Sequence, residues 1–187
     1  VLVDDFDARE PAVCDLAHNV GAVVVVDNAF ATPIYSYALK CGADLVVYST
    51  TKHVDGQGRC LGGVILGNKD LIRKKIEPYL KHTGAAMSPF NAWVMLKSLE
   101  TLDIRVRTQT ATALMVAQGL QSHPKLNRVL YPHLDTHPQF ALASDLMEGG
   151  GTVVSIDIKG GQAAAFRFIN KLEIFLISNN FADAKSI

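Results

Sequence analysis

Lys52 and the residues before it have side chains that can hold an aldehyde cofactor. Lys52 follows three hydroxyl residues, and Asp27 ends an apolar run earlier in the chain. A lysine amine forms a Schiff base with an aldehyde, a carboxylate stabilises a protonated ring nitrogen, and hydroxyl groups bind phosphate. Pyridoxal 5'-phosphate (PLP) requires all three interactions. The sequence therefore predicts that Lys52 holds PLP covalently and that Asp27 holds its ring nitrogen.

Ser49 and Thr51 are the candidates for the phosphate. They lie two residues apart, so in an extended segment their hydroxyl groups point to the same side. Each residue alone has an ordinary interpretation: a surface lysine, an aspartate that caps a helix, or a Ser-Thr-Thr turn. The joint pattern favours the cofactor site.

The apolar runs on either side predict the elements that position these residues. Residues 22–26 form a run of mostly β-branched residues that is typical of a strand covered on both faces in a parallel sheet. Residues 45–48 and 62–66 predict two more strands, and helices are expected at 7–19 and 34–40. This alternation is typical of an α/β domain, in which ligands bind at the carboxyl ends of the strands. Asp27 and Lys52 are both expected at that edge.

The second half of the chain predicts further helices and strands. We expect a surface helix at 70–79 and one long helix at 90–122 that bridges two domains. The remaining predicted elements are a strand at 128–131, a helix at 138–147, a strand at 152–158 and a helix at 162–171. The expected domains are the later part of a cofactor domain (1–87), the connecting long helix (88–122) and an incomplete C-terminal α/β domain (123–187).

Composition narrows the classes of partner. The sequence is 49% hydrophobic, with 18 Lys and Arg against 18 Asp and Glu, and neither charge forms a long block. This favours a small-molecule partner over nucleic acid or a membrane surface. Cys14, Cys41 and Cys60 lie far apart, so we expect reduced thiols, no metal site and a cytoplasmic protein. Because the chain runs from Val1 to Ile187 without an initiating methionine, we expect a fragment of a longer protein.

Four segments carry a resemblance to a known family. Residues 24–33 (VVVDNAFATP) and 42–52 (GADLVVYSTTK) resemble the Cys/Met-metabolism family of PLP enzymes, and the separation of Asp27 from Lys52 agrees. The resemblance continues through residues 88–93 (SPFNAW) and 99–105 (LETLDIR) into the C-terminal part. Ala29 and Gln109 depart from the residues usual in the family.

Two segments resemble one branch of the family, the O-succinylhomoserine sulfhydrylases. One is residues 52–63 (KHVDGQGRCLGG), in which Arg59 lies where lyases and synthases usually have an aspartate. The other is residues 177–186 (ISNNFADAKS), in which two asparagines replace a serine that lies near the substrate in the lyases. Asn180 and Arg59 are therefore candidates for substrate contacts. Arg59 has two alternatives: an ion pair with an aspartate such as Asp55, or a contact with a backbone carbonyl.

The resemblance implies an α/β protein of fold type I, like aspartate aminotransferase, that forms a homotetramer. It implies a trans-sulfuration transferase of methionine biosynthesis, in which sulfide replaces succinate on O-succinylhomoserine. Cystathionine γ-synthase and a cystathionine or methionine γ-lyase are alternatives within the family. A non-catalytic segment that keeps a cofactor-binding core is an alternative of another class. The family's phosphate loop, its ring-stacking tyrosine and its carboxylate-binding arginine are expected outside residues 1–187, so we expect this segment alone to be inactive.

Overall fold

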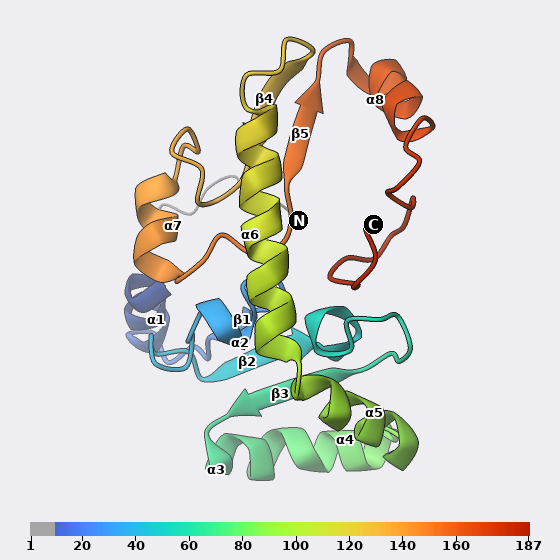
Figure 1. The fold of residues 1–187 in the computed structure, drawn as a ribbon. Coiled ribbons are helices and arrows are strands. Elements are labelled where there is room, and N and C mark those ends of the chain that lie inside the picture. The colour runs from blue at the N-terminus through green and yellow to red at the C-terminus, as the bar shows by residue number, and fades with distance from the viewer. Residues whose placement is uncertain (1–9) are drawn as a thin grey trace.

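The computed structural model describes residues 10–187 and shows a lower sheet-and-helix part joined by a long helix to a smaller upper part (Figure 1). The first helix, α1, spans Glu10–His18. Residues 7–9 of the predicted helix lie outside the described residues. The sheet contains β1 (Val25–Asp27), β2 (Leu45–Ser49) and β3 (Gly63–Gly67), in that order.

The sheet is mixed rather than parallel throughout. β1 pairs with β2 in parallel, with Asp27 opposite Val47, whereas β2 and β3 are antiparallel. A chain can return to an antiparallel neighbour through a loop, without a crossover helix. Here the return is made by residues 50–62, which begin with a π-helical turn, η1 (Thr50–Val54).

The prediction that the first strand is covered on both faces is wrong for the described structure. Val24 and Val26 pack against a buried cluster that includes Cys14 and Val46. Val23 and Val25, which alternate with them, are 56% and 54% exposed. The strand also begins at Val25 rather than Ala22.

The helix after β1 is shorter than predicted. α2 spans Thr32–Tyr35, and the chain turns at residues 38–42. The side-chain amide of Asn28 donates to the carbonyl oxygens of Thr32 and Ser36, at 3.2 and 3.1 Å. A longer helix would use the Ser36 carbonyl as an acceptor for the Lys40 N–H. The Asn28 amide therefore binds a carbonyl oxygen that a continuing helix would need as an acceptor.

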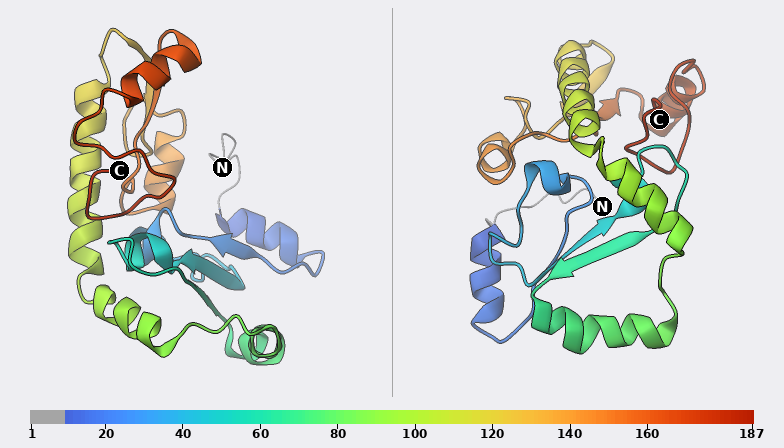
Figure 2. Two further views of the ribbon diagram at one scale, coloured as in Figure 1. Left: turned by 90° about the vertical axis from the view of Figure 1, so that its right-hand side faces the viewer. Right: turned by 60° about the horizontal axis from the view of Figure 1, so that its bottom comes forward.

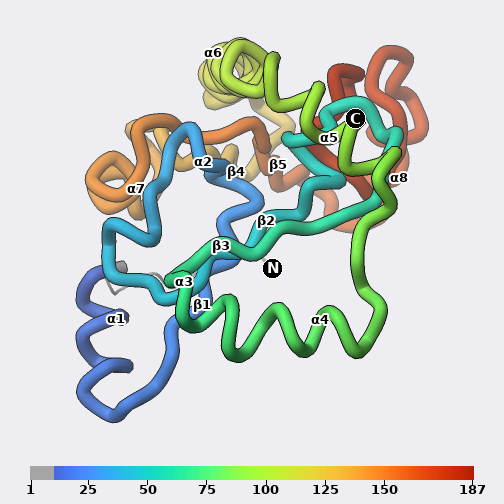
Figure 3. The backbone as a smooth tube through the Cα atoms, turned by 90° about the horizontal axis from the view of Figure 1, so that it is seen from below, coloured from blue at the N-terminus to red at the C-terminus, as the bar shows by residue number. Residues whose placement is uncertain are grey.

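The helical segment at the bottom of Figure 1, seen from below in Figure 3, is longer than the predicted 70–79. It consists of α3 (Lys69–Leu71), the π-helical turn η2 (Ile72–Ile76) and α4 (Glu77–Thr83).

The predicted long helix is two helices that meet at an angle (Figure 2). α5 spans Pro89–Leu99 and α6 spans Leu102–Leu120. Thr101, between them, has φ −115° and ψ 4°, outside the helical region. The apolar pattern continues on both sides of this break and therefore did not reveal it.

The upper part packs against α6. β4 (Leu126–Leu130) and β5 (Ser155–Ile158) are antiparallel, and Val129 and Tyr131 form a buried cluster with Ala113 and Ala117 of α6. α7 (Phe140–Leu146) and α8 (Gly161–Ile169) complete this part. Among residues 10–187, no helix is both long enough and apolar enough to cross a membrane.

After α8 the chain returns to the lower part (Figure 1). The Ala184 N–H donates to the carbonyl of Gly56 at 2.7 Å, and the Gln109 side chain donates to the carbonyl of Asp183 at 2.9 Å. The C-terminal segment, residues 170–187, is thereby held beside η1.

Candidate active site

Asp27, Ser49 and Lys52 lie at one edge of the sheet. Asp27 ends β1 and Ser49 ends β2, and these strands are parallel. Lys52 lies in η1, directly after β2, with non-helical backbone angles of φ −87° and ψ −121°. The sequence-predicted residues thus share the carboxyl edge where ligands bind in α/β sheets.

The C-terminal segment reaches the Lys52 amine. Lys52 Nζ donates to Asn180 Oδ1 at 2.5 Å and lies 4.7 Å from the centre of the Phe181 ring. Phe181 stacks on Phe30, with ring centres 4.5 Å apart. In the described part of the chain, Lys52 forms no ion pair with a carboxylate, so a neutral amide and an aromatic face hold its amine.

His53 connects the lysine turn to two other segments. Its Nδ1 lies 3.1 Å from the carbonyl oxygen of Ala29, and its Nε2 lies 2.8 Å from Thr152 Oγ1, just before β5. Burial, together with the positive charge of Arg105, lowers the pKa of His53 to about 4, although the hydrogen bond with the Ala29 carbonyl acts in the opposite direction. The ring is therefore neutral near pH 7, with Nδ1 donating to the carbonyl and Nε2 accepting from the Thr152 hydroxyl.

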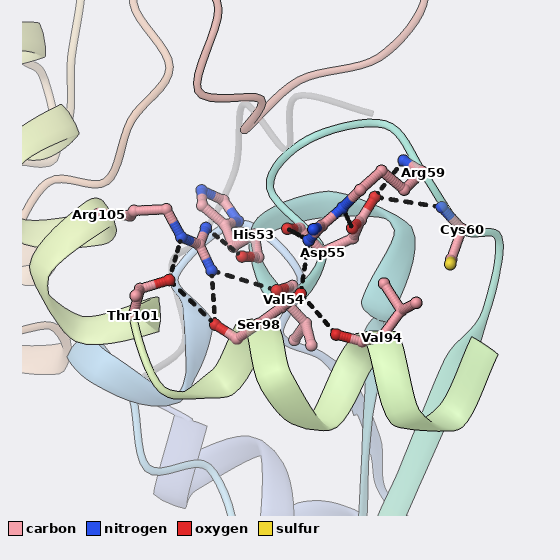
Figure 4. Close-up of polar contacts among 9 residues, drawn as sticks. All are labelled: His53, Val54, Asp55, Arg59, Cys60, Val94, Ser98, Thr101 and Arg105. Atoms are coloured by element: carbon pink, nitrogen blue, oxygen red, sulfur yellow. Dashed lines mark hydrogen bonds and ion pairs between the residues drawn. The ribbon is translucent and has the colours of Figure 1, made fainter. Parts of the chain in front are cut away.

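Asp55 and Arg59 hold the loop after η1 (Figure 4). The fully buried Asp55 carboxylate accepts from the backbone N–H groups of Arg59 and Cys60, at 2.5 and 3.2 Å, and from Arg59 Nε at 2.9 Å. Arg59 Nη2 donates to the Asp55 carbonyl and to Ser98 Oγ. The Arg59 guanidinium therefore pairs with Asp55, as in the first alternative, and its contact with a substrate stays a prediction.

The chain is not extended after Ser49, which corrects the reasoning used for Thr51. Thr51 lies in the π-helical turn, and its hydroxyl exchanges hydrogen bonds with the carbonyl and N–H of Gly62, at 3.3 and 3.0 Å. Its hydroxyl therefore fixes the start of β3. Ser49 is half-buried, and the neighbouring Thr50 Oγ1 is buried without a hydrogen-bond partner in the described structure.

The Asp27 side chain is exposed, although it ends a strand that the apolar run predicted to be covered on both faces. Its Oδ1 accepts from the Ala29 N–H at 3.0 Å, which is ordinary turn chemistry. Exposure leaves the carboxylate accessible to a ligand. An accessible amine, carboxylate and hydroxyl at one sheet edge fit the aldehyde, ring nitrogen and phosphate of PLP.

Sequence reasoning assigned no role to three residues around the lysine. They are His53, Arg105 and Phe181. Each lies within or beside a segment that carried the family resemblance, which was the available signal. Their contacts join segments far apart in sequence and could not be deduced from spacing.

Comparison with known proteins identifies the family. The profile of the Cys/Met metabolism PLP-dependent enzymes matches residues 6–187. The chain belongs to this family. Its members' cofactor is PLP, and its fold is that of the fold-type I PLP enzymes, of which this chain represents a part.

Two relatives are O-succinylhomoserine sulfhydrylases. That of Mycobacterium tuberculosis is 49% identical over 94% of this chain and 44% of the relative. That of Pseudomonas aeruginosa is 45% identical over 94% of this chain and 43% of the relative. The structure of cystathionine gamma synthase from Xanthomonas oryzae pv. oryzae, in complex with cystathionine, is similar with a TM-score of 0.91 and 34% identity, over 95% of this chain and 46% of that one. The chain thus spans less than half the length of these relatives.

Proposed function

We propose that the protein carrying this chain is a PLP-dependent sulfhydrylase, which converts O-succinylhomoserine and sulfide into homocysteine and succinate in methionine biosynthesis. Identities of 49% and 45% to two O-succinylhomoserine sulfhydrylases support this choice. A probable cystathionine gamma-synthase of Herpetosiphon aurantiacus and an L-methionine gamma-lyase of Fusobacterium nucleatum subsp. polymorphum are 37% and 36% identical. The observation that carries the catalytic proposal is the Lys52 amine held by Asn180, from the distant C-terminal segment.

In this proposal Lys52 has two tasks. It holds the cofactor covalently, and once released its amine carries a proton between Cα and Cβ of the substrate. Bound PLP supplies a ring that withdraws electrons from the substrate carbon. Asn180, which accepts a hydrogen bond from Lys52 Nζ at 2.5 Å, orients that amine and reaches the substrate beside it.

Asp27 and Ser49 hold the two ends of the cofactor in this proposal. The Asp27 carboxylate keeps a proton on the ring nitrogen, because a negative charge beside it favours the protonated form. The hydroxyl of Ser49, at the end of β2, binds the phosphate. Thr51 stays a candidate for the phosphate only if its hydroxyl leaves Gly62.

The acceptor distinguishes the proposed reaction from its alternatives. A sulfhydrylase turns over O-succinylhomoserine with sulfide, whereas a cystathionine γ-synthase uses cysteine as the acceptor. A γ-lyase cleaves cystathionine or methionine without a second substrate. Three parallel assays of the intact protein separate these activities. They use O-succinylhomoserine with sulfide, O-succinylhomoserine with cysteine, and cystathionine or methionine without an acceptor. Its assembly, proposed to be a homotetramer, can be measured on the same sample by sedimentation.

The first prediction concerns Lys52. In the intact protein, Lys52→Ala should abolish both turnover and the visible absorbance of bound cofactor, because the covalent link and the proton carrier are lost together. Borohydride reduction of the unmodified protein, followed by peptide mapping, should find the phosphopyridoxyl label on Lys52. A matched control is Lys69→Ala, which removes an exposed lysine in α3.

The labelling experiment also separates catalysis from cofactor binding alone. A label on another lysine would remove Lys52 from the proposed site. A label on Lys52 in an intact protein that turns over none of these substrates would favour a non-catalytic binding module.

A further inference from the structure

The last carbonyl groups of η1 need donors from outside the turn. Backbone N–H groups of Asp55 and Gly56 bond to the carbonyls of Thr50 and Lys52, at 2.9 and 2.8 Å. The carbonyls of His53 and Val54 come later in the turn, where a helix end leaves acceptors unsatisfied. Both residues are buried, so an external donor is required.

Arg105, near the start of α6, supplies these donors (Figure 4). Its Nη1 donates to the His53 carbonyl at 2.7 Å, and its Nη2 donates to the Val54 carbonyl at 3.2 Å. Nη2 also donates to the Ser98 carbonyl at 3.1 Å, and Nε donates to Thr101 Oγ1 at 3.1 Å. One planar guanidinium therefore joins the lysine turn to the break between α5 and α6.

Burial, neighbouring charges and the small size of Gly56 determine the environment of the Arg105 guanidinium. Desolvation by burial and the positive charge of Arg59 both lower the pKa of Arg105, whereas Asp55 raises it. A Cβ atom on Gly56 would lie 2.1 Å from Arg105 Nη1, so the chain can bring the guanidinium against the turn only with glycine there. The guanidinium reaches the backbone on either side of the bond between His53 and Val54, and it has no hydrogen bond to Lys52 Nζ in the described structure.

We propose that Arg105 is a positioning residue, which fixes the backbone of the lysine turn so that Lys52 Nζ stays at Asn180 and Phe181. Loss of the guanidinium leaves two buried carbonyls without donors and lets the turn move. A displacement of about 1 Å at a reacting group can cost about a hundredfold in rate. This inference rests on the proposed function, because Lys52 must be the cofactor lysine for its position to affect chemistry.

Three variants of the intact protein test the role of Arg105. Arg105→Ala should lower kcat about tenfold or more, with KM changed less than about threefold, and should shift the midpoint of the pH titration of the visible cofactor band by about one unit. Arg105→Lys should recover part of both changes, since an ammonium group can still donate to one carbonyl. Thr101→Val, which removes the acceptor for Nε, should give smaller shifts in the same direction.

The matched control is Arg107→Ala. Arg107 lies two residues after Arg105 in α6, is exposed, and forms an ion pair with Asp103. This variant should leave the cofactor band and kcat unchanged. If Arg105→Ala fails to fold by circular dichroism, the lysine and Thr101→Val variants carry the test. Arg105 variants that match Arg107→Ala in kcat and titration midpoint would overturn the inference while leaving the proposed function intact. An unmodified protein without a visible band would overturn the proposed function itself, and the inference with it.

Discussion

Asp27 differs from the other residues of the site because its carboxylate faces solvent and has one backbone donor, the Ala29 N–H. We predict that Asp27→Asn in the intact protein keeps PLP bound but lowers kcat about a hundredfold, because a neutral amide cannot stabilise a protonated ring nitrogen. Asp27→Glu should also be impaired, since its carboxylate is displaced by a methylene group. The measurements are kcat and the ratio of bound PLP to protein. Near-normal turnover in Asp27→Asn would exclude the carboxylate from the mechanism.

His53 makes stability depend on pH. Its pKa is lowered from 6.5 to about 4 in the folded chain, so the unfolded chain binds the proton more tightly. The contribution of neutral His53 to the free energy of unfolding is therefore complete above pH 6.5, and it is lost as the pH falls from 6.5 through 4. The loss is about 3 kcal/mol as an upper estimate, from a difference of roughly 2.5 pKa units.

We predict that His53→Gln weakens this dependence. Its free energy of unfolding, measured by urea titration, should fall less between pH 6.5 and pH 4 than that of the unmodified protein. His82→Gln, which changes an exposed histidine in α4, is the control and should keep the original dependence. Equal slopes for His53→Gln and the unmodified protein would mean that His53 is not the group responsible.

The sequence predicted the kinds of side chain at the site better than their surroundings. Lys52, Asp27 and Ser49 lie at one sheet edge because each lies at, or just after, the end of a strand that an apolar run predicted. The exposure of Asp27 and the hydrogen bonds of Thr51 depend on a turn geometry that residue types do not specify. The contact of Lys52 with Asn180 joins positions 128 residues apart, which spacing alone cannot predict.

At the scale of elements, the turn after Lys52 depends on a glycine. Gly56 has φ +65°, where side chains are disfavoured, and an added Cβ would meet Arg105 Nη1 at 2.1 Å. We predict that Gly56→Ala lowers the free energy of unfolding by about 2 to 4 kcal/mol, because backbone strain and displacement of the guanidinium add together. Chemical denaturation measures this change.

Gly84→Ala is the matched control for Gly56→Ala. Gly84, after α4, has φ +78°, but an added Cβ there has no atom within 4 Å. It should therefore lose only about 1 kcal/mol, from the backbone conformation. Similar losses in the two variants would show that the Arg105 contact adds nothing to the glycine requirement.

Periodicity predicted the presence of elements more reliably than their ends and directions. The strands β2 and β3 follow their apolar runs, but their antiparallel pairing is set by the π-helical turn between them. The break between α5 and α6 has no glycine or proline to mark it, and Arg105, just after it, donates to the distant carbonyls of His53 and Val54. Tertiary contacts of this kind override local pattern.

At the scale of the whole molecule, two apolar surfaces of the described chain face solvent. One is on α5, where Phe90, Trp93 and Leu96 are 69%, 57% and 62% exposed. The other lines an apolar cavity of about 620 Å³ between β1 and α7, and it includes Val25, Leu142 and Leu146. Soluble monomers rarely expose large contiguous apolar patches. The resemblance predicted the fold, but it did not predict which apolar surfaces of the described chain face solvent.

The last prediction is that the isolated chain, residues 1–187, self-associates, binds PLP weakly and has no turnover. Its exposed apolar surfaces favour association, because burying them releases ordered water, while the chain spans only 44% of the sulfhydrylase that it matches at 49% identity. Sedimentation of the purified chain over a range of concentrations should show a rising mass, and borohydride should label Lys52 at low occupancy. Phe90→Ser and Trp93→Ser together should reduce the association, whereas Lys81→Ser, an exposed polar change in α4, should not. A monomeric chain with full turnover would show that residues 1–187 contain every group that the reaction needs, and the site would then have to be completed by side chains described here.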